Sequence, residues 1–194
     1  MAEAELIDAL RAGDQDAWRQ TLQANLPALI GYATRMTGDR ASGEEVVQEA
    51  LVTVYKGLSA FEGRCSLRSW MFKAVRSRAL DELRRRGRVV LSPHGDPLED
   101  AFDGRGRWRE EPPELGSDLD SRIDAQRALA QVRRQVDRLP HDLREVFLLR
   151  EVQGLDSSEI CAALEITPQN LRTRLHRARK QLRAQVVRAI QEGV

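Results

Sequence analysis

Two closely spaced helix starts limit what the C-terminal part of this chain can fold into. Asp156 precedes a short apolar run and has Glu159 three positions later, the spacing of a reciprocal helix cap. Thr167 stands directly before Pro168, a residue favoured in the first turn of a helix. The space between the two starts holds one short helix and a tight turn. A short helix, a turn and a longer basic helix make a helix-turn-helix, which we predict here.

The second helix of a helix-turn-helix lies in the major groove of DNA, and its first residues face the base edges. Asn and Gln side chains pair with adenine, Arg pairs with guanine, and later Arg and Lys residues suit phosphates. The predicted DNA-contacting residues are Gln169, Asn170, Arg172, Thr173, Arg174, His176, Arg177, Arg179 and Lys180. The apolar stripe expected to face the domain core is Leu171, Leu175, Ala178 and Leu182. Charge alone would also fit a solvated face or a partner-binding helix.

The distribution of charge supports a nucleic-acid partner more than the formal net charge of +1 does. Residues 64–88 contain nine Lys or Arg and two acids, and residues 168–190 contain seven Lys or Arg and no acid. Residues 95–124, between them, contain ten acids and four Arg. Two basic blocks around an acidic middle are typical of chains that bind nucleic acid.

The N-terminal part shows helical apolar periods and almost no strand pattern. Helices are expected over residues 3–12, from Asp14 to Gly38, and over residues 42–59. Pro27 should kink or break the second of these near Asn25. The side chains expected to point inward from the third are Val46, Val47, Ala50, Leu51, Val54, Tyr55 and Leu58.

A fourth helix is expected after Ser66, which can cap it. Trp70 falls on the apolar stripe of this helix and is expected in the core, whereas Phe72 is expected to be more exposed. After Gly87 the helical period is lost, and residues 89–121 are predicted to be a flexible, acidic linker. The fold is therefore predicted to be all-α, with two small helical domains, 1–88 and 122–194, joined by that linker.

Several function classes find no support in the sequence. His94, His141 and His176 are scattered, and no metalloprotease, nucleophile-elbow or phosphate-loop motif occurs. Cys65 and Cys161 form no CxxC pair, so neither a disulfide framework nor a zinc site is indicated. No apolar run is long enough for a membrane span, and the acidic N-terminus does not read as a secretion signal. We expect a cytoplasmic protein without catalytic residues, metal or cofactor.

The segment "RLPHDLREVFLLREVQGLDSSEICAALEITPQNLRTRLHRARKQLR" closely resembles the −35-binding domain of bacterial sigma factors, in particular those of the extracytoplasmic-function (ECF) group. The segment "GEEVVQEALVTVYKGLSAFEGRCSLRSWMFKAVRSRALDELRRRGR" resembles the −10-binding domain of the same family. There are departures. Glu165 stands where the family often has Gly, which costs roughly 1 kcal/mol if the backbone is left-handed there. Ser77 replaces a frequent Asn, and Cys161 a common Ala.

The resemblance implies a dissociable subunit that gives core RNA polymerase its promoter specificity, melts the promoter and starts transcription. Glu45, Gln48 and Glu49 would meet the clamp helices of the β′ subunit, and the C-terminal domain would sit near the β flap. An anti-sigma protein is an expected further partner. The residues that would hold the melted −10 strand are Phe61, Glu62, Gly63, Arg64, Cys65, Ser66, Arg68, Lys73, Arg76 and Ser77.

A stand-alone helix-turn-helix regulator that binds duplex DNA without polymerase is the alternative hypothesis. It accounts for the C-terminal half equally well. It does not account for the "FEGRCSLRSW" pattern or for the acidic third helix, for which a repressor has no use.

Overall fold

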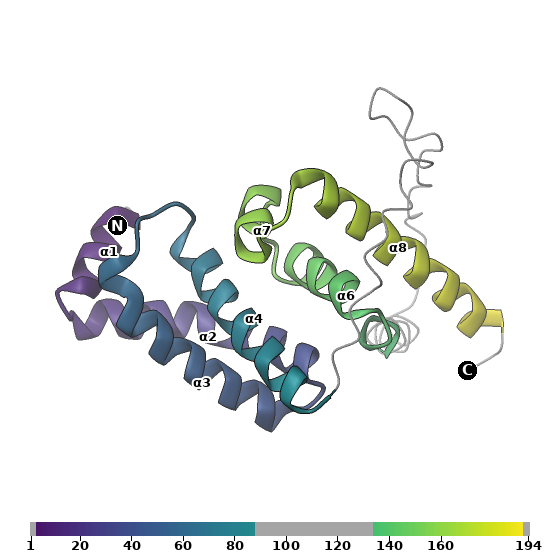
Figure 1. Ribbon diagram of the computed structural model, residues 1–194, viewed down its shortest axis with the longest axis horizontal. Helices are drawn as coiled ribbons and strands as arrows, with labels where there is room; N and C mark the ends of the chain where they lie inside the picture. Colours follow the sequence, from purple (N-terminus) through teal and green to yellow (C-terminus); the bar gives the residue numbers. More distant parts are fainter. Residues whose placement is uncertain (1–2, 88–133, 192–194) are drawn as a thin grey trace, which may run out of the picture. The chain divides into compact units, whose positions relative to one another are not determined.

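The computed structural model describes residues 3–87 and 134–191, with side chains up to residue 184, and the regular structure of these residues is entirely helical (Figure 1). The predicted all-α class is thereby confirmed. The chain forms two compact units: Met1–Val89 with Glu145–Leu171, and Val90–Arg144 with Arg172–Val194. The expected linker, 89–121, lies outside the described residues.

The N-terminal segment folds into α1 (Glu3–Arg11), α2 (Gln15–Thr37), α3 (Arg40–Gly57), the short 3-10 helix η1 (Leu58–Ala60) and α4 (Leu67–Arg85). The expected caps form. Asp14 accepts hydrogen bonds from the backbone of Asp16 and Ala17, and Ser66 accepts one from Ser69. Gly38 ends α2 in the left-handed conformation, with φ 89°. These local signals fix where each helix begins and ends.

Of the kink or break expected near Asn25, the break is wrong: α2 is continuous over Gln15–Thr37 with Pro27 inside it. The Asn25 side-chain amide donates a hydrogen bond of 2.9 Å to the Thr21 carbonyl. A proline removes only one backbone donor, so packing of the rest of the helix and side-chain bonds of this kind can hold it together.

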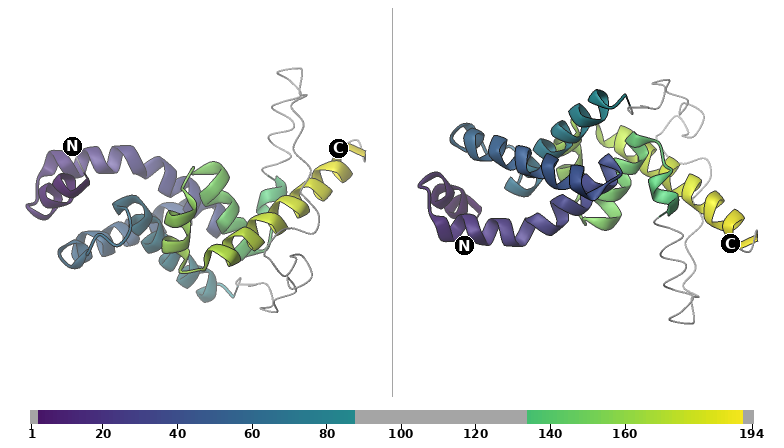
Figure 2. Two further views of the ribbon diagram at one scale, coloured as in Figure 1. Left: turned by 90° about the horizontal axis from the view of Figure 1, so that it is seen from above. Right: turned by 90° about the horizontal axis from the view of Figure 1, so that it is seen from below.

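α3 packs against both α2 and α4, and the views in Figures 1 and 2 show these helices running alongside one another. Side chains of the shared core are almost fully buried: Tyr32, Ala33, Met36, Val47, Ala50, Phe72, Val75 and Ala79. Phe72 is only 1% exposed, and its ring meets that of Tyr32 edge to face at 5.5 Å. The expectation of an exposed Phe72 is therefore wrong, because both α2 and α3 pack against α4.

Two further aromatic residues differ from expectation. Tyr55 is 63% exposed rather than inward, and its ring lies 5.4 Å from that of Trp18. Trp70 is half-buried and stacks on Phe61 with ring centroids 4.7 Å apart. Apolar period alone assigns both rings to a core, but here part of each faces solvent.

The N-terminus of α3 is tied to the last turn of α4. Asp39 accepts hydrogen bonds from the backbone and hydroxyl of Ser42. Arg86 binds Asp39 at 3.1 Å and the Ser42 hydroxyl at 2.6 Å, and it also pairs with Glu82. The hydrogen bonds from Ser42 and then from Arg86 lower the pKa of Asp39 from 3.8 to about 2.

The C-terminal segment contains α6 (His141–Phe147), the π-helical turn η2 (Leu148–Val152), α7 (Ser157–Leu164) and α8 (Pro168–Gln191). The predicted reciprocal cap is present: Asp156 accepts from the Glu159 backbone at 2.8 Å, and Glu159 accepts from the Asp156 backbone at 2.9 Å. Thr167 caps α8 by accepting from the Asn170 backbone. The predicted helix-turn-helix is thus formed by α7, a tight turn and α8.

Gly43 gives the sharpest test of this packing. A Cβ atom placed there would lie 2.6–2.8 Å from side-chain and backbone atoms of Thr34, so one of the two helices must shift. We expect Gly43→Ala to destabilise the chain by about 1–3 kcal/mol in urea unfolding. The matched control is Gly31→Ala in α2, where a Cβ meets nothing within 4 Å. That variant should be stabilised by about 0.5–1 kcal/mol, and equal effects would contradict the close approach.

The Asp39 carboxylate gives a pH-dependent test. Because folding lowers its pKa to about 2, its contribution to stability is present above 3.8 and is lost as pH falls through about 2. Asp39→Asn should therefore lower the melting temperature at about pH 6, and the difference from wild type should close towards about pH 2. Asp8→Asn, on a side chain 77% exposed, is the control and should have a smaller effect. A gap that stays constant with pH would refute the assignment.

Candidate nucleic-acid interface

The first turns of α8 present polar side chains to solvent and apolar ones to the core. Gln169, Asn170 and Arg172 are exposed, and Thr173 is half-buried. The stripe predicted to be internal is buried: Leu171, Leu175, Ala178 and Leu182. Because these leucines fix the rotation of α8 about its axis, the residues predicted to face base edges are held on the outer face.

Further along α8, Arg179 and Lys180 are exposed, while Arg174, His176 and Arg177 are half-buried. Burial, followed by the charges of Lys180 and Arg179, lowers the pKa of His176. A neutral imidazole at pH 7 can both donate and accept a hydrogen bond. The structure thus places the predicted −35 residues on one helix, with most of the charged ones after the residues predicted to contact bases.

The loop between η1 and α4 is held by groups that the sequence did not point to. Arg11 of α1 donates to the carbonyls of Phe61 at 2.6 Å and Leu58 at 3.3 Å. Glu3 accepts from the Leu67 backbone at 2.7 Å, at the first turn of α4. The contacts of Arg11 and Glu3 join residues far apart in the sequence, so no local sequence pattern predicts them.

Within this loop, Glu62, Gly63 and Arg64 are exposed, and Gly63 has φ +70°. Phe61 is buried against Trp70 and so supports the loop from beneath. Cys65 is half-buried, and burial raises the pKa of its thiol; burial also raises that of Cys161. A raised thiol pKa means less thiolate and lower reactivity near neutral pH.

The predicted −10 residues of α4 are engaged by the segment 145–165, which belongs to the same compact unit. Arg68 donates to the Gln153 carbonyl at 2.8 Å, and Lys73 pairs with Glu165 at 2.6 Å. Ser77, also in the −10 set on this helix, is exposed. Basic residues expected to be free for DNA are therefore occupied by other parts of the chain.

Besides Lys73, two further members of the −10 set, Arg76 and Ser66, bind carboxylates. Arg76 binds Glu145 through two nitrogens, at 2.8 and 3.3 Å. Ser66 donates to Glu159 at 2.8 Å, and Ser69 donates to the same oxygen at 3.3 Å. Acidic groups therefore border α4 both at its start, where Glu159 lies, and near its middle, where Glu145 lies.

Glu165 adopts φ 56° and ψ 44° at the end of α7, so the left-handed conformation considered for this position is present. It is the one non-glycine residue with positive φ among the described residues. The hydrogen bond and charge of Lys73 lower the pKa of its carboxyl group. The residue that departs from the family pattern therefore has a specific side-chain partner.

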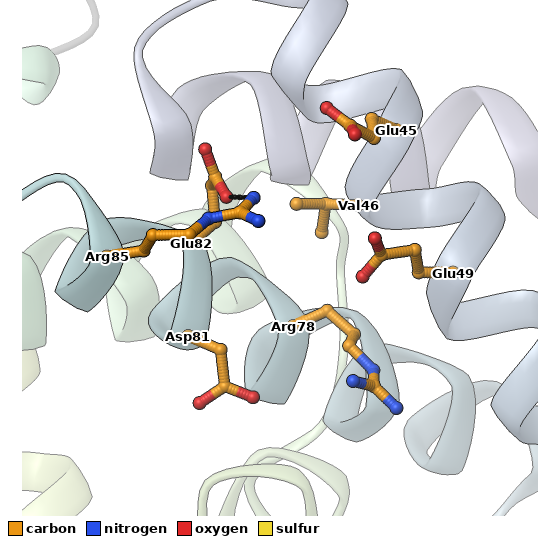
Figure 3. Close-up of a pocket in the computed structure, with 7 residues that line it drawn as sticks. All are labelled: Glu45, Val46, Glu49, Arg78, Asp81, Glu82 and Arg85. Atoms are coloured by element: carbon orange, nitrogen blue, oxygen red, sulfur yellow. Dashed lines mark hydrogen bonds and ion pairs between the residues drawn. The ribbon is translucent and has the colours of Figure 1, made fainter.

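The exposed face of α3 carries Glu45, Gln48 and Glu49, which are all solvent-accessible as predicted for a docking surface. A hollow of about 190 Å³ lies on this side of α3. It is lined from α3 by Glu45, Val46 and Glu49 and from α4 by Arg78, Asp81, Glu82 and Arg85, whose side chains are drawn in Figure 3. Arg85 pairs with Glu82 there. The sequence did not indicate this hollow, because it forms only where two helices meet.

None of the helices in the described part of the chain combines the length and apolar character needed to cross a bilayer.

Comparison with known proteins gives matches on both halves. The family model Sigma-70 region 2 matches residues 21–89, and Sigma-70, region 4 matches residues 129–182. A probable RNA polymerase sigma factor of Haemophilus influenzae is 31% identical over 169 residues, which are 83% of this chain and 85% of the relative. The ECF RNA polymerase sigma-E factor of Escherichia coli is 27% identical over 183 residues, covering 93% and 92% of the two chains.

Solved structures with the same fold include CnrH in complex with the cytosolic domain of CnrY. It has a TM-score of 0.66 and 22% identity, and the match covers 95% of this chain and 96% of CnrH. The sigma factor RpoE of Bartonella quintana, in complex with the anti-sigma factor NepR, has a TM-score of 0.61 and 23% identity, over 87% and 96% of the chains.

A region 2 followed by a region 4, together with relatives over nearly the full length, defines an RNA polymerase sigma factor of the sigma-70 family. Within that family the chain belongs to the ECF group. It acts in transcription initiation by binding core polymerase and directing it to promoters. The alternative of a stand-alone helix-turn-helix regulator is not favoured, because the region 2 match occupies the N-terminal half.

Proposed function

We propose that this sigma factor divides promoter recognition between α8 and α4 and docks on core polymerase through α3. The observation that carries the proposal is the orientation of α8. Gln169, Asn170 and Arg172 are exposed at its start, while its leucines are buried. An amphipathic helix in this orientation can enter a major groove without disturbing its own core.

At the −35 element, the residues at the start of α8 read bases and the later cations hold phosphates. Asn170 and Gln169 have the donor and acceptor pair that matches adenine, and Arg172 matches guanine. Arg174, His176, Arg177, Arg179 and Lys180 supply contacts along the backbone, with Thr173 between the two groups. The order along the helix separates sequence readout from general affinity.

At the −10 element, the loop from Phe61 to Ser66 and the first half of α4 hold the melted strand. Arg11 and the Phe61–Trp70 stack support the loop, and its tip carries the exposed residues Gly63 and Arg64. Unpairing a base costs roughly a few kcal/mol, and binding of the unpaired base by this loop offsets that cost. Arg68, Lys73, Arg76 and Ser77 then extend the path along α4 with positive charge and polar groups.

On polymerase, Glu45, Gln48 and Glu49 are the residues that would meet the clamp helices of β′, and the C-terminal domain would lie near the β flap. Glu45, Gln48 and Glu49 occupy one exposed face of α3, and the opposite face of this helix is buried against α2 and α4. We propose that two domains, residues 1–88 and 122–194, carry these interactions and that the acidic linker 89–121 joins them. The polymerase supplies the catalysis, so this subunit needs no catalytic residue of its own.

An anti-sigma protein is a further proposed partner. The solved relatives RpoE and CnrH are described in complexes with NepR, an anti-sigma factor, and with the cytosolic domain of CnrY. Because polymerase and promoter DNA are the other partners, we place the protein in the cytoplasm.

Reconstitution with core polymerase tests the docking surface. Wild-type protein should bind core polymerase and support run-off transcription from a promoter that it recognises. Glu49→Lys should weaken core binding about tenfold, because a docking charge is reversed. Asp8→Lys, an exposed acid on α1, is the matched control and should bind like wild type. Equal core binding by Glu49→Lys and Asp8→Lys would show that this face of α3 is not part of the interface.

Arginine substitutions on α8 test the separation of base and phosphate contacts. Arg172→Ala should lose about 1–3 kcal/mol of discrimination at one −35 position. Arg179→Ala should weaken binding to all sequences alike and reduce the salt slope by about 1. Affinity measured across single-base variants of the site, at several salt concentrations, separates the two. Equal, sequence-blind losses from both variants would show that Arg172 does not face the bases.

A further inference from the structure

The loop of residues 61–66, called the recognition loop below, is bonded at both ends to one helix, α1. At the C-terminal end of α1, Arg11 donates a hydrogen bond of 2.6 Å to the Phe61 carbonyl. At the N-terminal end of α1, Glu3 accepts a hydrogen bond of 2.7 Å from the backbone N–H of Leu67. Figure 1 shows α1 beside this loop. One short helix thus holds the point where the loop begins and the point where it ends.

Arg11 fixes the direction in which the chain enters the loop. Its guanidinium also donates to the Leu58 carbonyl in η1, at 3.3 Å, so a single side chain holds two carbonyls. A guanidinium presents several N–H donors in a fixed plane, whereas the ammonium of lysine is a point charge. The Phe61 ring stacks on Trp70 with centroids 4.7 Å apart. Phe61 is therefore held by its ring on one side and by its backbone on the other.

Glu3 supplies part of the N-terminal cap of α4 from a different helix. The first N–H groups of a helix have no partner within that helix. Ser66 accepts a hydrogen bond from the backbone of Ser69, and Glu3 accepts the one from Leu67, the first residue of α4. The helix dipole also favours a carboxylate at this end. Glu3 therefore fixes the position at which the loop passes into α4.

α1 is itself anchored to the helices of the core. Leu10 is only 2% exposed, and the indole N–H of Trp18 in α2 donates to the Leu10 carbonyl at 3.2 Å. The Trp18 ring also lies against Tyr55 of α3. The recognition loop has no regular secondary structure of its own. Its shape therefore depends on contacts that come from outside the loop, and α1 connects it to the rigid part of the segment.

We propose that Arg11 and Glu3 are positioning residues of the −10 site. By holding both ends of the recognition loop, they keep it in the shape that receives the unpaired base. This inference rests on the proposed role of the loop in holding the melted strand. A loop that already has its bound shape loses less conformational freedom on binding, so both affinity and base discrimination depend on these contacts. The two side chains act through the loop backbone and not through contact with DNA.

Amide hydrogen exchange, measured by NMR on the free full-length chain, tests whether α1 holds the loop. Glu3→Ala removes the acceptor of the Leu67 N–H, whose exchange should become about tenfold faster. Glu3→Gln keeps an acceptor oxygen, so this amide should exchange within about twofold of the wild-type rate. Asp16→Ala, at an exposed acid of α2, is the control and should leave the Leu67 amide unchanged. Unchanged exchange in Glu3→Ala would overturn the proposal.

DNA binding by reconstituted holoenzyme tests the effect on recognition. The probe is a promoter that wild-type holoenzyme recognises, with its −10 element left unpaired, together with its single-base variants in the unpaired stretch. Arg11→Ala should bind the preferred sequence about tenfold more weakly and lose about fivefold of its discrimination at a −10 base. Discrimination at the −35 element should not change. Arg11→Lys should fall between wild type and Arg11→Ala, because an ammonium cannot hold both carbonyls in the same way.

Arg19→Ala is the matched control, because it removes an exposed cation of α2, and it should behave like wild type. If Arg11 only stabilised the fold, Arg11→Ala would lower the melting temperature and weaken binding to all −10 bases alike. That result, or unchanged −10 discrimination in Arg11→Ala, would overturn the positioning role.

Glu62→Ala with Arg64→Ala changes the exposed tip of the recognition loop and separates this proposal from the proposed function. If the tip variant alters −10 discrimination while the variants of Arg11 and Glu3 do not, only the positioning role is refuted. If neither the tip variant nor Arg11→Ala alters it, the loop does not bind the −10 base, and the proposed function fails at that point as well.

Discussion

The packing of α3 between α2 and α4 determines where every exposed surface of the N-terminal segment lies. Val46, Val47, Ala50 and Val54 are buried on one side of this helix, so Glu45, Gln48 and Glu49 must face outward on the other. Gly43 permits α3 to approach Thr34 of α2 more closely than any residue with a Cβ would. Hydrophobic burial thus supplies the energy of the fold and also sets the orientation of its charges.

Charge pairing refines this arrangement at the helix ends. Arg86 ties the end of α4 to the cap of α3 through Asp39 and Ser42, and Arg11 holds the loop that precedes α4. Exposed pairs of this kind contribute little to stability individually. These contacts matter for position, because each fixes a loop or a helix end next to a surface that we propose binds DNA or polymerase.

Local sequence signals predicted much of the structure because their physics is local. The caps at Asp14, Ser66, Asp156 and Thr167 each need only a side chain and the next turn of backbone. A proline within a helical period does not by itself predict a break, because the packing that keeps α2 continuous through Pro27 involves distant residues. The burial of Phe72 and the exposure of Tyr55 do not follow from the helical period, which shows which residues share a face but not how many faces are covered.

Short stretches of sequence are enough to predict the all-α class, the helix-turn-helix, the stripe that orients α8 and the resemblance to ECF sigma factors, because periods, caps and motifs are local. The partners of the charged residues of α4 are visible only in the folded chain. The contacts of Ser66, Arg68, Lys73 and Arg76 reach residues far away along the chain. Such pairs form when folding brings distant segments together, so a basic stretch read from the sequence cannot reveal that its charges already have acidic partners.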